Sequence, residues 1–177
     1  MYPFNPYLQL FQNRIPRYMK SASINELKAT LKTMSQPQLT DLCLRLARFK
    51  KENKELLTYL LYEADDLPAY MNAIKKELDE EMSTINTGNL HWVKKSMRKV
   101  LRLLNKHIRY TQSKMAEAEL RLHFCLLLKN FRVSIFKSAA LSNLYYSQIK
   151  KIEVALKGMH EDLERDYRVQ LEALQQR

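Results

Sequence analysis

A run of cationic side chains between residues 94 and 109 indicates chemistry more strongly than any other part of this sequence, and that chemistry is the binding of anions. No acidic residue occurs between Met82 and Ala116, where eight Lys or Arg occur. At about 100° per residue, this stretch forms an amphipathic helix with one apolar and one cationic side. The predicted apolar side comprises Val93, Met97, Val100, Leu101, Leu104 and Ile108. The candidate contacts with an anionic partner or nucleic acid are Lys94, Lys95, Arg98, Lys99, Arg102, Lys106 and Arg109.

The cationic side has a functional and a structural interpretation. It could follow a phosphate backbone, in which case binding would be steeply salt-dependent, with Trp92 stacking on a base or lying at a lipid headgroup boundary. In a purely structural helix, the acidic segments 77–81 or 161–166 would lie against it. An acidic protein is a further partner of the right charge. A membrane surface fits less well, because the following helix can bury the apolar side.

Metal chemistry is indicated only by two acid–histidine pairs. Glu119 with His123, and His160 with Glu164, have the spacing of neighbours on one helix face. Such pairs are more typical of surface salt bridges. The Glu-x-x-His, His-Glu-x-x-His and Cys-x-x-Cys patterns of metal sites do not occur. We therefore predict no metal ligand and no cofactor.

Enzymatic chemistry has no supporting constellation. The sequence has no Gly-x-Ser-x-Gly elbow, and its two glycines cannot form a phosphate-binding loop. Its four histidines are dispersed, so no acid–base pair is indicated by spacing. We predict a non-enzymatic helical interaction or scaffold module with no small-molecule substrate. The alternative function is nucleic-acid binding through residues 94–109.

Composition predicts the fold class. The 177 residues are 46% hydrophobic and include only two glycines and five prolines, too few for a many-stranded sheet. Good helix formers dominate, which predicts an all-α protein. The formal charge of +11 favours polyanionic partners.

Short helices are predicted in the first half of the chain. Ser23 with Glu26 forms a capping box, Pro37 marks a helix start, and Asp65 or Asp66 precedes Pro68. Helices are expected to begin near residues 24, 36, 53 and 67. The spacing of these helix starts resembles that of stacked α-hairpins of the HEAT or armadillo kind, although the sequences of successive hairpins do not align as a repeat.

Longer helices are predicted in the second half, over 90–110, 113–131 and 138–157. The helix over 113–131 is apolar nearly all round, as is typical of a central buried helix. Gly158 either ends the third of these helices or is tolerated within one long helix. The tail carries Leu163, Tyr167, Leu171 and Leu174 as a stripe that packs on another helix or on a second copy.

Three segments are predicted: an aromatic arm over 1–20, short hairpins over 21–86, and a bundle of long helices over 87–177, the last two forming one globular unit. Cys43 and Cys125 lie in apolar runs and are expected to be buried thiols. No signal peptide and no membrane span is indicated, so a cytoplasmic location is expected, with a protein partner or self-association.

Overall fold

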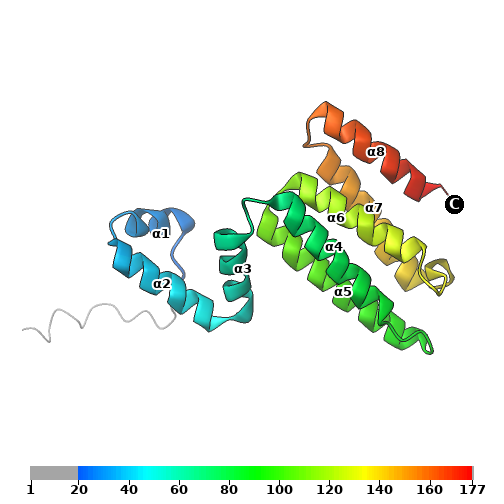
Figure 1. Cartoon of the computed structure of the whole chain (residues 1–177), viewed down its shortest axis with the longest axis horizontal. Helices are drawn as coiled ribbons and strands as arrows, with labels where there is room; N and C mark the ends of the chain where they lie inside the picture. The colour runs from blue at the N-terminus through cyan, green and yellow to red at the C-terminus, as the bar shows by residue number, and fades with distance from the viewer. Residues whose placement is uncertain (1–19, 177) are drawn as a thin grey trace, which may run out of the picture. The chain divides into compact units, whose positions relative to one another are not determined.

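The computed structural model describes residues 20–176 of the chain. Within this range the chain forms eight α-helices, one 3₁₀ helix and no strand, which confirms the all-α prediction (Figure 1). The chain divides into two compact units between Lys51 and Glu52. Apart from Lys20, the predicted aromatic arm over 1–20 lies outside the described residues.

The first unit contains α1 (Ile24–Leu31) and α2 (Gln36–Phe49). The predicted capping box at α1 is confirmed, because the Ser23 N–H donates to Glu26 Oε2 at 2.7 Å and the Glu26 N–H to Ser23 Oγ at 3.3 Å. Neither helix has a buried residue. Large apolar side chains are exposed on both, namely Ile24, Leu27, Leu31, Leu44, Leu46 and Phe49. The positions of α1 and α2 are therefore explained by the capping interactions at their ends and not by burial of side chains.

The second unit contains the remaining helices. They are α3 (Lys51–Tyr62, whose first residue precedes the division), α4 (Leu67–Ser83), α5 (Leu90–Thr111), α6 (Lys114–Lys129), the 3₁₀ helix η2 (Ile135–Lys137), α7 (Ala139–Leu156) and α8 (Glu161–Gln175). α6 is central: it packs against α4 and α5 on one side and against α7 and α8 on the other (Figure 1). Leu120, Phe124 and Cys125 of α6 have no exposed surface. The predicted central helix is confirmed.

Local signals account for most helix boundaries. The first four helices begin at residues 24, 36, 51 and 67, and the Asp66 side chain caps α4 by accepting from the Ala69 N–H. Gly158 lies in the turn between α7 and α8, so the chain does not continue there as one helix. The resemblance to HEAT or armadillo hairpins stays a prediction.

Burial departs from the sequence expectation at two places. Cys125 is buried, but Cys43 is exposed, because no described element of its unit buries α2. In the α8 stripe, Leu171 and Leu174 are buried, whereas Leu163 is 42% exposed. Tyr167 is half-buried and packs against the core, so Leu163 is the one member of the stripe that is exposed. Among residues 20–176, no helix combines the length and apolarity needed to cross a bilayer.

Candidate functional site

α5 orients the candidate cations through its buried face. The helix begins at the Asn89 cap, whose side chain accepts from the His91 N–H at 2.8 Å, and it ends at Gln112 in the left-handed region, at φ 49°. The buried side chains of α5 are Val93, Met97, Val100, Leu104, Ile108 and Tyr110. Because this face is held in the core, the cationic face points outward. Leu101, which is on the predicted apolar side, is half-buried and packs against the core.

Two of the candidate lysines are neutralised by carboxylates. Lys99 Nζ lies 2.8 Å from Glu81 Oε2 on α4, and Lys106 Nζ lies 2.9 Å from Glu55 Oε2 on α3. Glu55 also accepts from the Tyr110 hydroxyl at 3.1 Å; burial and this hydrogen bond raise the pKa of Tyr110 to about 12, so it stays a donor. The acidic segment 77–81 thus reaches one edge of the cationic face through Glu81.

Among the described residues, the other acidic segment forms its ion pairs with its neighbours in sequence. In residues 161–166, Asp162 pairs with His160 at 3.5 Å and Glu164 with Arg168. Lys95 Nζ lies 5.1 Å from the ring centroid of Trp92, a cation–π distance. The structural interpretation is therefore supported at Lys99, which pairs with Glu81 of the acidic segment 77–81.

Three arginines remain on the middle of the face. Arg98, Arg102 and Arg109 are exposed, and none of them forms an ion pair with any residue in 20–176. At about 100° per residue they lie within about 40° of one another around α5, over about 16 Å of its length. We call these three residues the arginine stripe. Lys94, beside it, is half-buried and also lacks an ion pair within the described range.

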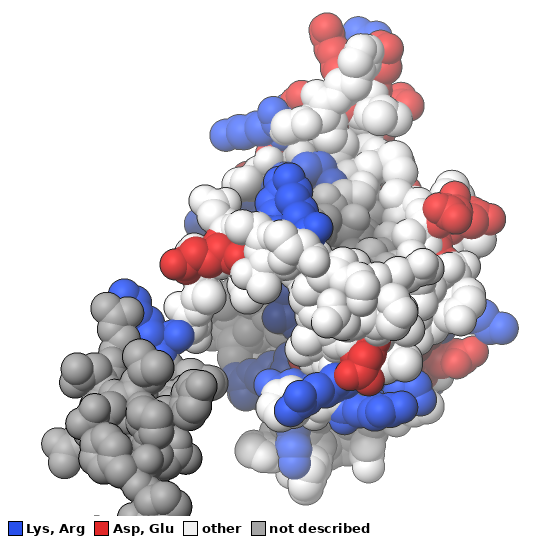
Figure 2. Space-filling model, turned by 90° about the vertical axis from the view of Figure 1, so that its left-hand side faces the viewer, with Lys and Arg blue, Asp and Glu red and all other residues white. Residues whose placement is uncertain are grey.

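Basic side chains also gather in groups on the face of the molecule drawn in Figure 2, with acidic side chains at scattered positions. A groove of about 880 Å³ runs along part of the stripe, between α5, α6 and the start of α3. It is lined by Glu52, Lys99, Arg102, Leu103, Asn105, Lys106, Ile108, Arg109, Glu117 and Arg121. Arg102 and Arg109 are its cations without an ion pair in the described chain. The groove is thus open and positively charged.

A buried arginine connects the helices behind this groove. Arg121 of α6 is only 4% exposed, and its guanidinium donates to Glu117 Oε1 at 3.0 and 3.1 Å. Its Nη1 donates to Asn105 Oδ1 of α5 at 3.1 Å and to Gln148 Oε1 of α7 at 2.6 Å. Sequence reasoning missed this network. The Glu117–Arg121 spacing of four residues was the available signal, but it is indistinguishable from a surface pair.

His107 of α5 lies among aromatic rings and not on the cationic face. Its Nδ1 is 2.7 Å from the Tyr70 hydroxyl, and its buried Nε2 has no hydrogen-bond partner, with Glu77 Oε2 3.6 Å away. Burial lowers the pKa of His107 to about 4; the neighbouring Lys106 adds to this and Glu55 opposes it. His107 is therefore neutral at pH 7.

We expect His107 to make the free energy of unfolding fall as the pH drops from about 6.5 to about 4, by about 1–2 kcal/mol once solvent access to the ring is allowed for. In this window the unfolded chain binds a proton at His107 and the native chain does not, so acid favours unfolding. Urea unfolding across the window measures it. His107→Gln should flatten this part of the pH profile; an unchanged profile in the variant contradicts the assignment.

The acid–histidine pairs of the sequence, for which we predicted no metal, have other partners. Glu119 accepts from Lys75 Nζ at 2.6 Å and from the Tyr167 hydroxyl at 2.8 Å, and His123 Nε2 lies 2.7 Å from Asp79 Oδ1. Burial raises the pKa of Glu119, but the hydrogen bonds from Lys75 and Tyr167 outweigh it and lower the pKa overall. Among the described residues, no group of three or more His, Cys, Asp or Glu is placed to hold a metal ion.

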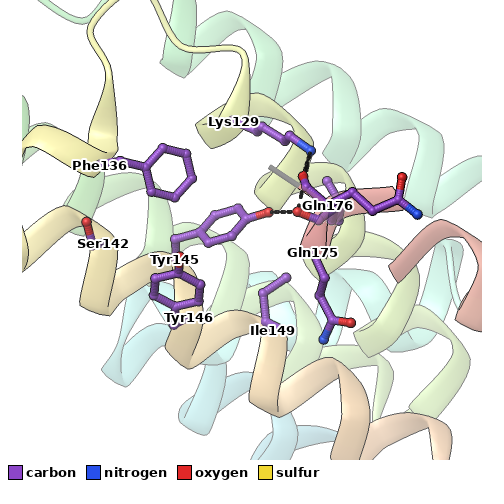
Figure 3. A pocket seen from close by; sticks show the side chains of 9 residues that line it. Lys129, Phe136, Ser142, Tyr145, Tyr146, Ile149, Gln175 and Gln176 are labelled. Carbon is purple, nitrogen blue, oxygen red and sulfur yellow. Dashed lines mark hydrogen bonds between the residues drawn. The ribbon is translucent and has the colours of Figure 1, made fainter. Parts of the chain in front are cut away.

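A second cavity, of about 670 Å³, lies between α6, α7 and the end of α8 (Figure 3). Phe136, Tyr145 and Tyr146 line it, with ring centroids 5.5–6.4 Å apart. The Tyr145 hydroxyl donates to the Leu174 carbonyl at 2.8 Å, and Lys129 Nζ donates to the Gln176 carbonyl at 2.7 Å. These polar groups hold the last turn of α8, so they are already satisfied without a ligand.

Fold and site together define an all-α protein with a cationic helix face. The lysines at one edge of this face pair with carboxylates, and the arginines along its middle have no ion pair within residues 20–176. Comparisons of the chain with protein-family models, with curated proteins and with solved structures find no significant match.

Proposed function

We propose that this protein is a non-enzymatic helical interaction module that binds an anionic partner through the arginine stripe. The observation that supports the proposal is that some cations of α5 pair with carboxylates and others do not. Lys99 and Lys106 have carboxylate partners, whereas Arg98, Arg102 and Arg109 are exposed and have no ion pair within residues 20–176. Arginine forms bidentate hydrogen bonds with carboxylates and phosphates, so such a row is suited to a polyanion.

Nucleic acid is the second candidate partner, and the length of the stripe favours it. The stripe extends over about 16 Å, the length of about five phosphates along one strand of a duplex. The adjoining groove provides room for a chain to lie beside Arg102 and Arg109. An acidic protein segment also has the right charge, and the polyglutamate peptide in the experiment below tests it.

Fluorescence anisotropy tests the proposal with labelled single-stranded DNA, duplex DNA, RNA and a polyglutamate peptide, at low and near-physiological salt. The test variant is Arg98→Gln/Arg102→Gln/Arg109→Gln. Lys106 is left unchanged because its loss would remove the partner of Glu55 and change the packing of α3 on α5. The matched control is Lys150→Gln/Lys151→Gln/Lys157→Gln, which removes the same charge from exposed positions at α7.

We expect the stripe variant to bind at least about tenfold more weakly than the control. Its salt dependence should lose about 2–3 counterions, because each phosphate contact releases about 0.7–0.9 of one. Equal binding by the two variants would assign any affinity to net charge alone. Absence of binding to every polyanion would reject the proposal and leave the stripe as a solvated helix face.

A further inference from the structure

Trp92 stands out at the first turn of α5 because its side chain is available to a ligand. It is the single tryptophan of the sequence and is 52% exposed, whereas tryptophan is highly buried on average. The His91 ring packs edge-on against it at a centroid distance of 5.7 Å, and Lys95 Nζ lies 5.1 Å from its ring centroid. Trp92 is therefore a half-exposed aromatic ring with a cation over it.

Lys95 lies between Trp92 and the arginine stripe on the surface of α5. At about 100° per residue, Lys95 lies about 60° around α5 from Trp92 and about 60° from Arg98. Along the axis, Trp92 precedes Arg98 by about 9 Å at 1.5 Å per residue. A ligand that crosses from Trp92 past Lys95 to Arg98 meets an aromatic ring first and then successive positive charges.

From this arrangement we infer, on the basis of the function proposed above, that the anionic partner is a single-stranded nucleic acid with a base stacked on Trp92. Proteins that bind single strands combine cations that follow the backbone with aromatic side chains on which bases stack. The bases of a duplex already stack on one another, so their faces are closed to an indole. An acidic peptide has no ring that must stack, and would use the arginines alone.

The buried side of α5 argues against a lipid surface. A helix lying on a membrane inserts its apolar face, but Val93, Met97 and Leu104 are fully buried in the protein core. Among the described residues of the first turn, only Leu90 and Trp92 are exposed and apolar enough to insert. This is a small contact compared with a continuous apolar face.

The experiment follows the intrinsic fluorescence of Trp92 in the full-length protein, where one tryptophan makes the signal specific to this site. The titrants are a short single-stranded DNA, an RNA of matching sequence, the corresponding duplex, polyglutamate, and vesicles containing anionic phospholipid. We expect saturable quenching by the single strands and no quenching by the duplex or by polyglutamate. Anisotropy in parallel reports binding whether or not the tryptophan senses it.

Variants test whether the ring itself carries the affinity. Trp92→Ala should weaken binding of single strands about tenfold and leave polyglutamate binding unchanged, because base stacking is lost. Trp92→Phe should restore much of the affinity, which a purely structural loss would not explain. Tyr62→Ala removes another exposed aromatic ring, from α3, and is expected to have no effect.

The outcomes separate this inference from the proposed function. If no polyanion binds, the proposed function itself fails. If polyanions bind through the arginines but Trp92→Ala binds single strands as well as the wild type does, the stacking inference is overturned and the proposed function stands. Equal affinity for duplex and single strands, or a fluorescence change with vesicles alone, also overturns the inference.

Discussion

Arg121→Ala is expected to lower the free energy of unfolding by about 3–5 kcal/mol. The guanidinium joins α6 to α5 through Asn105 and to α7 through Gln148, and pairs with Glu117 on its own helix. Its removal leaves Gln148, which is 1% exposed, without its 2.6 Å donor, and leaves the Glu117 carboxylate without its partner on the next turn. Urea unfolding, followed by helical circular dichroism and Trp92 fluorescence, measures the loss.

A double variant distinguishes a lost network from lost packing. Arg121→Met/Gln148→Leu removes both polar groups and keeps most of the volume, so it should recover a large part of the stability lost in Arg121→Ala. Arg121→Lys keeps the charge but cannot make the same set of hydrogen bonds, and should fall between the wild type and Arg121→Ala. A loss below about 1 kcal/mol in Arg121→Ala would contradict the role assigned to this network.

Phe124→Ala is expected to cost about 3–5 kcal/mol, the usual range for truncation of a buried phenylalanine. Phe124 lies on α6, has no exposed surface, and is surrounded by the layers that α6 joins. The denaturation midpoint should fall while the slope with denaturant stays the same, because the surface exposed on unfolding changes little.

Phe49→Ala is the matched control for this prediction. The chemical change is identical, but Phe49 ends α2 and is 76% exposed. We expect a change within about 0.5 kcal/mol. If Phe49→Ala also lost several kcal/mol, Phe49 would have to be buried in solution, which would contradict its 76% exposure.

Local sequence signals determined the helices of this protein well. The Ser23–Glu26 capping box, the Asp66 cap and the apolar face of α5 each depend on residues within one or two helical turns. Such signals act through the local backbone, so they can be read without knowing what packs nearby. The candidate cations of α5 follow from the same periodicity, and their outward orientation follows from the burial of Val93 and Leu104.

The pairing of charges was decided by the tertiary structure. Glu55 and Lys106 are 51 residues apart, and Gln148 lies 27 residues from Arg121, so no local pattern links them. The exposure of Cys43 has the same origin, because an apolar run predicts burial only when another element covers it. The sequence alone determined that α5 has a cationic face; the packing of α3 and α4 decided that Lys99 and Lys106 are neutralised while Arg98, Arg102 and Arg109 have no ion pair within the described residues. The physical reason is that a side chain's charge and helix position are local properties, whereas its partner depends on which helices meet.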